Sequence, residues 1–308
     1  MRVAMMGSGG VGGFFGAKLV QAGCDVVFIA RGAHLAAMRD RGLRVASTGH
    51  PELHLPRVNA VEDPSQVGEV DVVILSVKLW DTEAAARAIA PMVGPRTGVL
   101  SLQNGVVKDD ILRRFFPPAQ VMGGVCYVAT HIGSPGVIQQ TGTMQRMVVG
   151  EYDAPPSARA TALRDALASQ GVAAELSEDI RRSLWEKYVF LVGLSGSTTA
   201  IRKPLGVVRA NPRSREFLAD LMRETVAVGR AHGVALPGDY AAQRMAFADT
   251  LPHDMTSSMH HDLERGNRLE VEWLSGGVVQ LGAARQVATP CNRAVWDILA
   301  PHAMGRAA

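Results

Sequence analysis

Cysteine is scarce in this chain of 308 residues, with three scattered copies at Cys24, Cys126 and Cys291. They form no CxxC pair and match no zinc-ligand spacing, so the sequence predicts neither a disulfide framework nor a metal site. Sparse cysteines are typical of free thiols in a reducing compartment, and we therefore expect a cytoplasmic protein. Met1 leads directly into an apolar segment, so we also expect no signal peptide.

Long hydrophobic runs and dense basic tracts are also missing. The longest apolar stretches, such as residues 70–77 with Asp71 inside, are too short to cross a bilayer, so no membrane span is expected. The formal net charge is only +3, the Lys and Arg residues are scattered, and aromatic residues make up 5%, so nucleic-acid binding gains no support. Hydrophobic residues are abundant at 47%, which is enough for two well-packed domains at this length.

The strongest motif lies at the start of the chain. Residues 1–6 read as a short apolar strand, and a glycine-rich loop precedes the next helical segment, consisting of Gly7, Ser8, Gly9, Gly10, Val11 and Gly12. This is G-x-G-x-x-G in its strand-to-helix setting, which indicates dinucleotide binding. The first glycine permits a tight turn, the second lets the backbone approach a pyrophosphate, and the third lets the helix pack on the strand. The helix N-terminus then offers N–H groups to the phosphates.

The residue after the second strand bears on which dinucleotide binds. Residues 24–30 read as that strand, and Arg31 follows where an NAD enzyme usually carries Asp or Glu for the ribose 2′-hydroxyl. A guanidinium fork suits a 2′-phosphate, so the sequence favours NADP. The alternative is that Arg31 is a solvated loop charge.

Strand-like and helix-like segments alternate through the first half of the chain. Apolar strands are expected at 71–77 and 98–105 with an Ala-rich helix at 81–92 between them, which predicts a doubly wound parallel sheet. Residues 121–151 are rich in Gly, Thr and Val and indicate strands and turns. From Asp179 on, the periodicity becomes helical, with helices expected at 180–195, 213–232, 239–249, 257–267, 270–286 and 294–304.

The predicted fold class is therefore α/β, with a Rossmann-type NADP-binding domain at 1–177 and an all-helical domain at 178–308. We expect the helical domain to serve substrate binding. A homodimer formed through this domain is an arrangement that the sequence leaves open.

Four further places carry polar residues suited to chemistry. Ser76-Val77-Lys78 and Gln103-Asn104-Gly105 each end a predicted strand, where ligands of open α/β sheets lie. Trp185-Glu186-Lys187 and the segment 257–270 lie in the helical half. In this order, and together with the glycine loop and the arginine after the second strand, they resemble the ketopantoate reductase (2-dehydropantoate 2-reductase) family over nearly the whole chain.

The resemblance implies reduction of a 2-oxo acid to a 2-hydroxy acid by NADPH, as in the formation of pantoate from ketopantoate in pantothenate biosynthesis. It implies that Lys187 is the general acid, because a hydride arriving at a ketone carbon leaves an alkoxide that needs a proton. It implies further that Glu270 binds the substrate oxygen and contacts the cofactor, and that Ser258 contacts the region of the substrate carboxylate. Asp262, four residues further along the same helical face, would position the lysine.

By the same resemblance, Lys78 and Asn104 would lie between cofactor and substrate, in a cleft between the two domains. Taken alone, each of these residues has a plainer interpretation: Lys187 and Glu270 as surface charges, and Asn104 as part of a turn. His260, His261, Asp262 and Glu264 could suggest a metal site, but their spacing matches no usual one, so helix-surface histidines are the favoured interpretation.

Several positions after the lysine depart from the family pattern, and they include Leu205, where the family has a further polar residue. The family commonly carries asparagines four and eight residues after the lysine, and Leu191 and Ser195 stand there in this chain. Leu191 cannot form a hydrogen bond, whereas Ser195 can still bind substrate. A site that loses polar groups loses discrimination for the hydroxyl they held, so a less hydroxylated 2-oxo acid is an alternative substrate. A 3-hydroxy acid dehydrogenase and a non-catalytic NADP(H) sensor are further alternatives.

Overall fold

The computed structural model describes residues 1–306 and divides into two compact units. Unit 1 comprises Met1–Gln103 and Lys108–Ile180, and unit 2 comprises Asn104–Val107 and the chain from Arg181 on. The sequence places the boundary at residue 177, slightly before the observed one. The short segment Asn104–Val107 belongs to unit 2 although its neighbours on both sides belong to unit 1.

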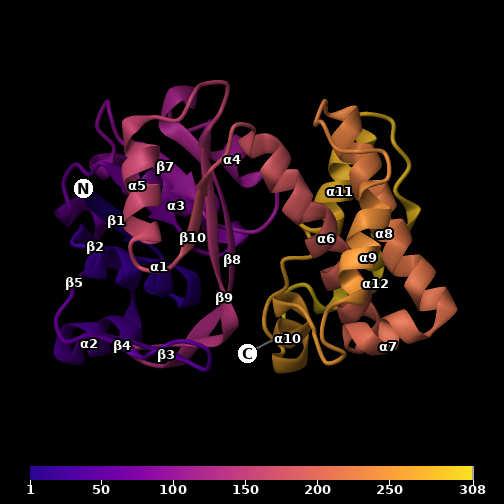
Figure 1. The fold of residues 1–308 in the computed structure, drawn as a ribbon, viewed down its shortest axis with the longest axis horizontal. Helices are drawn as coiled ribbons and strands as arrows, with labels where there is room; N and C mark the ends of the chain where they lie inside the picture. The colour runs from indigo at the N-terminus through magenta and orange to yellow at the C-terminus, as the bar shows by residue number, and fades with distance from the viewer. Residues whose placement is uncertain (307–308) are drawn as a thin grey trace. The chain divides into compact units, whose positions relative to one another are not determined.

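Unit 1 is built on one ten-stranded sheet (Figure 1). Its strands are β1 (Arg2–Met6), β2 (Asp25–Ile29), β3 (Leu43–Ser47), β4 (Leu53–Leu55), β5 (Asn59–Val61), β6 (Val72–Leu75), β7 (Gly98–Ser101), β8 (Val121–Ser134), β9 (Val137–Glu151) and β10 (Ala173–Leu176). The order is β4-β3-β9-β8-β7-β6-β1-β2-β5, and β10 pairs with β9. The strands from β5 to β8 in this order are all parallel, which confirms the Rossmann-type prediction for that part.

The prediction of a parallel sheet is wrong beyond β8. Strand β9 runs antiparallel to β8, and β4 runs antiparallel to β3, so the sheet is mixed. Only Pro135 and Gly136 separate β8 from β9, and Gly136 has a φ of 80°. A connection of two residues can join antiparallel strands only, because a parallel pair needs a long crossover.

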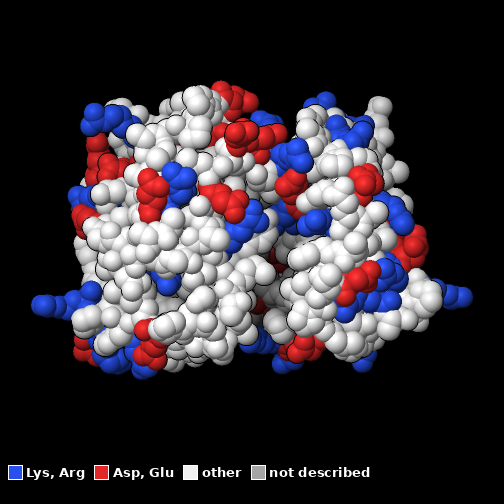
Figure 2. Space-filling model, viewed as in Figure 1, with Lys and Arg blue, Asp and Glu red and all other residues white. Residues whose placement is uncertain are grey.

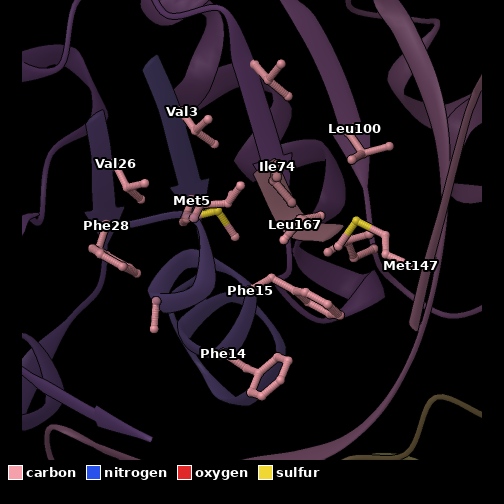
Figure 3. Close-up of a cluster of buried hydrophobic side chains, with 14 of the residues drawn as sticks. Val3, Met5, Phe14, Phe15, Val26, Phe28, Ile74, Leu100, Met147 and Leu167 are labelled. Atoms are coloured by element: carbon pink, nitrogen blue, oxygen red, sulfur yellow. The ribbon is translucent and has the colours of Figure 1, made fainter. Parts of the chain in front are cut away.

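The helices of unit 1 cover the sheet on both faces. They are α1 (Gly10–Gln21), α2 (Gly32–Arg41), α3 (Thr82–Ile89), α4 (Lys108–Leu112) and α5 (Ala158–Ala168), with short 3₁₀ turns η1 (Pro64–Gln66), η2 (Leu79–Asp81), η3 (Ala90–Met92) and η4 (Pro118–Gln120). Alternate residues of the buried strands point to opposite faces. Val3 and Met5 of β1 pack with Phe14 and Phe15 of α1 (Figure 3), whereas Ala4 lies in the core on the other face.

The regular elements of unit 2 are all helices among its described residues, as the sequence predicts. Its helices are α6 (Ile180–Ile201), whose first residue belongs to unit 1, α7 (Leu205–Ala210), α8 (Pro212–Ala231), α9 (Tyr240–Asp249), α10 (Ser258–Arg265), α11 (Ser275–Ala283) and α12 (Pro290–Leu299), and η5 (Ala300–His302) follows. The prediction of a helix over 270–286 is wrong at its start, because α11 begins only at Ser275. The N–H groups of Trp273 and Leu274 both donate to the carbonyl of Glu270, which closes a turn there instead.

The next two observations concern the distribution of surface charge and the length of the apolar helices. Figure 2 shows basic and acidic side chains interspersed over the face that it draws. Within residues 1–306, no helix is long and apolar enough to cross a membrane.

The contact between α1 and β1 generates a first prediction. A methyl group on Gly12 would lie 2.1 Å from the carbonyl oxygen of Gly7, whereas a methyl group on Gly9 would meet no atom within 4 Å. We expect Gly12→Ala to lower the free energy of unfolding by about 1–3 kcal/mol, because the helix must move away from the strand. Gly9→Ala is the matched control and should unfold like the unmodified protein in urea. Equal stability of the two variants would contradict this packing.

Candidate functional site

The glycine-rich loop is tied to the end of β2. Gly7 has a φ of 93°, and a methyl group there would lie 2.9 Å from the backbone nitrogen of Val77. The N–H groups of Gly7 and Ser8 both donate to the carbonyl of Ile29, at 3.3 and 3.0 Å. The hydroxyl of Ser8 donates to the same carbonyl at 3.0 Å. A glycine is therefore required at the turn, and the loop is held on two sides.

The loop residues fit a bound pyrophosphate. Gly9 is the N-cap of α1, has no side chain to satisfy the helix, and faces open space where a Cβ would be. The first N–H groups of an α-helix have no intrahelical acceptor, and the helix dipole is positive at this end. Donors and open space together are what an anionic group needs at a helix N-terminus.

Two predicted cofactor residues lie at the same edge of the sheet as this loop. Met6 of β1 pairs in register with Ile29 of β2 and with Leu75 of β6, so the three parallel strands end level with one another. Arg31 follows β2 as the exposed N-cap of α2, and Lys78 follows β6 as the exposed N-cap of η2. The structure thus brings both cations to the carboxyl edge that carries the glycine loop.

In unit 2, the structure joins two of the predicted catalytic and binding residues. The half-buried Lys187 of α6 donates from Nζ to Oδ1 of Asn104 at 2.9 Å, although 83 positions separate them in the chain. Asn104 belongs to the short segment that follows β7. The hydrogen bond to the amide oxygen fixes the direction of one N–H of the ammonium group. It thereby limits the directions in which the remaining two N–H groups can point.

One face of α6 continues from this lysine. Leu191 and Ser195 follow at intervals of four residues and so lie on the same side of the helix. Leu191 is half-buried, and Ser195 is fully buried with a hydroxyl that has no hydrogen-bond partner among the described residues. A buried hydroxyl without a partner is costly, so Ser195 is a candidate for contact with a bound polar group.

Ser258 and Asp262 lie one turn apart on α10, as predicted. Ser257 caps this helix by accepting from the N–H of His260 at 3.1 Å, and Ser258 is exposed at the first helical position. Asp262 accepts from the side chain of Asn267 at 3.0 Å. Glu270 is buried, and it lies in the turn before α11 rather than on a helix.

The neighbouring residues His260 and His261 differ in burial. His261 is exposed as predicted, but the prediction of a surface position is wrong for His260. This residue is buried where α10 contacts α6, and its Nδ1 lies 2.8 Å from the carbonyl oxygen of Thr198. Its Nε2 lies 3.1 Å from a carboxylate oxygen of Glu264. Among residues 1–306, no group of three or more His, Cys, Asp and Glu residues is arranged to hold a metal ion.

Tyr188 has a role that its sequence does not indicate. Its hydroxyl donates to the carbonyls of Leu274 at 2.7 Å and Trp273 at 3.0 Å, which belong to the turn that starts at Glu270. Burial raises the pKa of Tyr188, so the group remains a neutral donor. The residue next to Lys187 therefore anchors the segment that carries Glu270.

The buried Lys108, the first residue of α4, is a second feature without a sequence signal. Nζ of Lys108 donates to the carbonyls of Ser101, at the end of β7, and of Gly124 in β8, at 2.8 Å for the latter. Lys108 directly follows the segment that contains Asn104. It therefore holds the strand end from which that segment departs.

A mostly parallel sheet with a glycine-rich loop at the carboxyl ends of its strands is the arrangement of a dinucleotide-binding protein. Two family models match this chain: "Ketopantoate reductase PanE/ApbA" over residues 3–154 and "Ketopantoate reductase PanE/ApbA C terminal" over residues 179–303. The chain belongs to the ketopantoate reductase family, whose members are NAD(P)-dependent oxidoreductases.

Individual relatives match over almost their whole length. The 2-dehydropantoate 2-reductase of Archaeoglobus fulgidus is 32% identical over 300 residues, covering 97% of this chain and 96% of the relative. The solved PanE/ApbA family ketopantoate reductase of Ralstonia eutropha JMP134 is 34% identical, with a TM-score of 0.88 and 98% coverage of both chains. A D-mandelate dehydrogenase solved with NADH and anilino(oxo)acetate shares the fold, with a TM-score of 0.88 at 22% identity.

The contacts of Tyr188 generate a prediction about unit 2. Tyr188→Phe removes the buried hydroxyl that donates to the carbonyls of Trp273 and Leu274, so we expect a loss of about 1–3 kcal/mol in the free energy of unfolding. The control is Tyr240→Phe, since the hydroxyl of Tyr240 lies 3.4 Å from the carbonyl of Glu186, farther than either carbonyl lies from the hydroxyl of Tyr188. Chemical denaturation of both variants measures the difference. If the two lose the same stability, the anchoring role of Tyr188 is wrong.

Proposed function

We propose that this protein reduces 2-dehydropantoate (ketopantoate) to pantoate with NADPH. The observation that carries the proposal is the hydrogen bond from Lys187 to Asn104, because it orients an ammonium group in a helical unit of the ketopantoate reductase type. Bound NADPH would supply the hydride that adds to the ketone carbon of the 2-oxo acid.

Lys187 is the proposed proton donor. The oxygen of the ketone gains negative charge as the hydride arrives, and an ammonium group directed at that oxygen stabilises the charge and then transfers a proton. Asn104 positions this ammonium by accepting one of its three N–H groups. The buried carboxylate of Glu270 would accept a hydrogen bond from a substrate hydroxyl and contact the cofactor.

The remaining substrate contacts are proposed from their places in unit 2. Ser258, exposed at the start of α10, would bind the substrate carboxylate, and Asp262 would help to position Lys187. The buried hydroxyl of Ser195 would bind the substrate, since it has no partner among the described residues. Each of these contacts uses a polar group that the sequence alone already singles out.

NADPH is the proposed cofactor form. The residues Gly7–Gly12 would hold the pyrophosphate, and Lys78 would add a cation at the same sheet edge. Arg31 is exposed directly after β2, at the position that reads the adenosine ribose, and its fork suits a 2′-phosphate. The free thiols of the three cysteines fit the reducing cytoplasm, where pantothenate biosynthesis would use this reaction.

A second candidate is reduction of a less hydroxylated 2-oxo acid. Leu191 favours it, because this half-buried apolar side chain stands one helical turn from Lys187, where the family commonly has asparagine. A site that lacks a hydrogen-bonding group for a hydroxyl discriminates poorly in favour of the hydroxylated substrate.

The test is NADPH oxidation by the purified protein, with ketopantoate beside a panel of less polar 2-oxo acids. We expect ketopantoate to be turned over, and Lys187→Ala to lower kcat by a factor of about 10²–10⁴, because the general acid is lost. The matched control is Lys203→Ala, which removes an exposed lysine of the same unit and should leave kcat unchanged. Turnover of the less polar acids alone would replace ketopantoate with the second candidate, and tight NADPH binding without any turnover would indicate a sensor.

The role of Arg31 has its own test. Arg31→Ala should raise the KM for NADPH about tenfold or more and leave the KM for NADH within about twofold, because only NADPH carries the 2′-phosphate. Steady-state kinetics with both cofactors measure the two values. Arg57→Ala removes another exposed arginine of unit 1 and should change neither KM. A parallel rise in both KM values would show that Arg31 does not read the 2′-phosphate.

A further inference from the structure

His34 connects the glycine-rich loop to a distant turn of the same unit. It lies in the first turn of α2, and its Nε2 is 3.0 Å from the carbonyl oxygen of Ser8. On the other side of the ring, the N–H of Gly136 donates to Nδ1 at 3.1 Å. Gly136 belongs to the tight turn between β8 and β9. The imidazole is half-buried between these two backbone groups.

The carbonyl of Ser8 and the N–H of Gly136 together determine which ring nitrogen of His34 carries the proton. A carbonyl oxygen can only accept, so Nε2 must carry a proton and donate to Ser8; an amide N–H can only donate, so Nδ1 must be unprotonated. Burial lowers the pKa of His34, and the bond to the carbonyl of Ser8 acts in the opposite direction with a smaller effect. The ring is therefore a neutral imidazole with a single tautomer that satisfies both backbone groups.

The carbonyl of Ser8 matters because of the peptide group to which it belongs. The N–H and the hydroxyl of Ser8 are already directed to the carbonyl of Ile29. The described peptide bonds include no cis bond, and in a trans peptide the N–H of residue 9 points opposite to the C=O of residue 8. Holding the carbonyl against His34 therefore turns the N–H of Gly9 away from the histidine. Gly9 is the N-cap of α1, with open space at its Cβ position.

We propose that His34 is a positioning residue for the dinucleotide, which fixes the direction of the Gly9 N–H before the pyrophosphate binds. The inference rests on the proposed function in that it requires the loop to hold a dinucleotide. It is independent of which 2-oxo acid is reduced. Because His34 lies three residues after Arg31 on the same helix turn, α2 would then serve both the ribose and the phosphate ends of the cofactor.

Two substitutions at this position separate the contacts. His34→Gln can place an amide N–H near the position of Nε2 and keep the bond to Ser8, whereas His34→Asn can place an oxygen near Nδ1 and keep only the bond to Gly136. The dissociation constant for NADPH, measured by nicotinamide fluorescence with the full-length protein, should rise about fivefold or more in His34→Asn. It should stay within about twofold in His34→Gln. In both variants kcat at saturating NADPH should remain near that of the unmodified protein.

A matched control is His50→Asn. The Nε2 of His50 also bonds a backbone carbonyl, that of Thr143 at 2.9 Å, but in the β3–β4 hairpin rather than at the glycine loop. This control should leave the NADPH dissociation constant unchanged. Equal affinity in His34→Asn and His34→Gln, or a loss in His50→Asn as large as that in His34→Asn, would overturn the positioning role.

A measurement without cofactor tests the same proposal if a variant fails to fold. Nitrogen-15 NMR of the histidine rings in the unmodified, cofactor-free protein should show His34 with Nε2 protonated and Nδ1 unprotonated. A ring protonated at Nδ1 at neutral pH would overturn the proposal. If the unmodified protein binds no NADPH while the ring has the expected tautomer, the proposed function fails, and the positioning role fails with it; NADPH binding combined with the other tautomer overturns only the role of His34.

Discussion

The site in unit 1 depends on the level ending of three parallel strands. Because Met6 lies in register with Ile29 and Leu75, the segments that follow β1, β2 and β6 all begin at one edge of the sheet. The glycine loop, Arg31 and Lys78 converge there as a result. This edge is where open α/β sheets bind ligands, since the helix N-termini point to it and the side chains of the next turns surround it.

The site in unit 2 depends on hydrogen bonds that connect α6 with segments far away in the chain. Lys187 reaches Asn104, and its neighbour Tyr188 reaches the carbonyls before α11. The two side chains leave α6 in different directions, so one helix can both present the ammonium and hold the turn of Glu270. A catalytic lysine needs such fixed surroundings, because proton transfer falls off when the donor is misplaced.

The sequence predicted those parts of the structure that local patterns control. The strand–glycine–helix segment, the arginine after β2 and the helical second half all follow from spacing and periodicity within short windows, and the structure confirms them. The errors occur at two turns that the sequence analysis did not recognise. The turn at Pro135 and Gly136 makes β9 antiparallel, and the turn at Glu270 delays α11, although neither departure is visible in hydrophobic periodicity.

By itself, then, the sequence determined the order of the elements and the dinucleotide loop, because each is encoded by neighbouring residues. The order of the motifs along the chain also carried the resemblance to a reductase family. Only the tertiary structure decided that Lys187 meets Asn104, 83 positions away, and that His34 bonds the carbonyl of Ser8 and the N–H of Gly136. Such contacts join residues whose separation in the chain carries no periodic signal. They exist because folding brings together polar groups from distant parts of the chain, and polar groups that lose contact with water are hydrogen-bonded to one another.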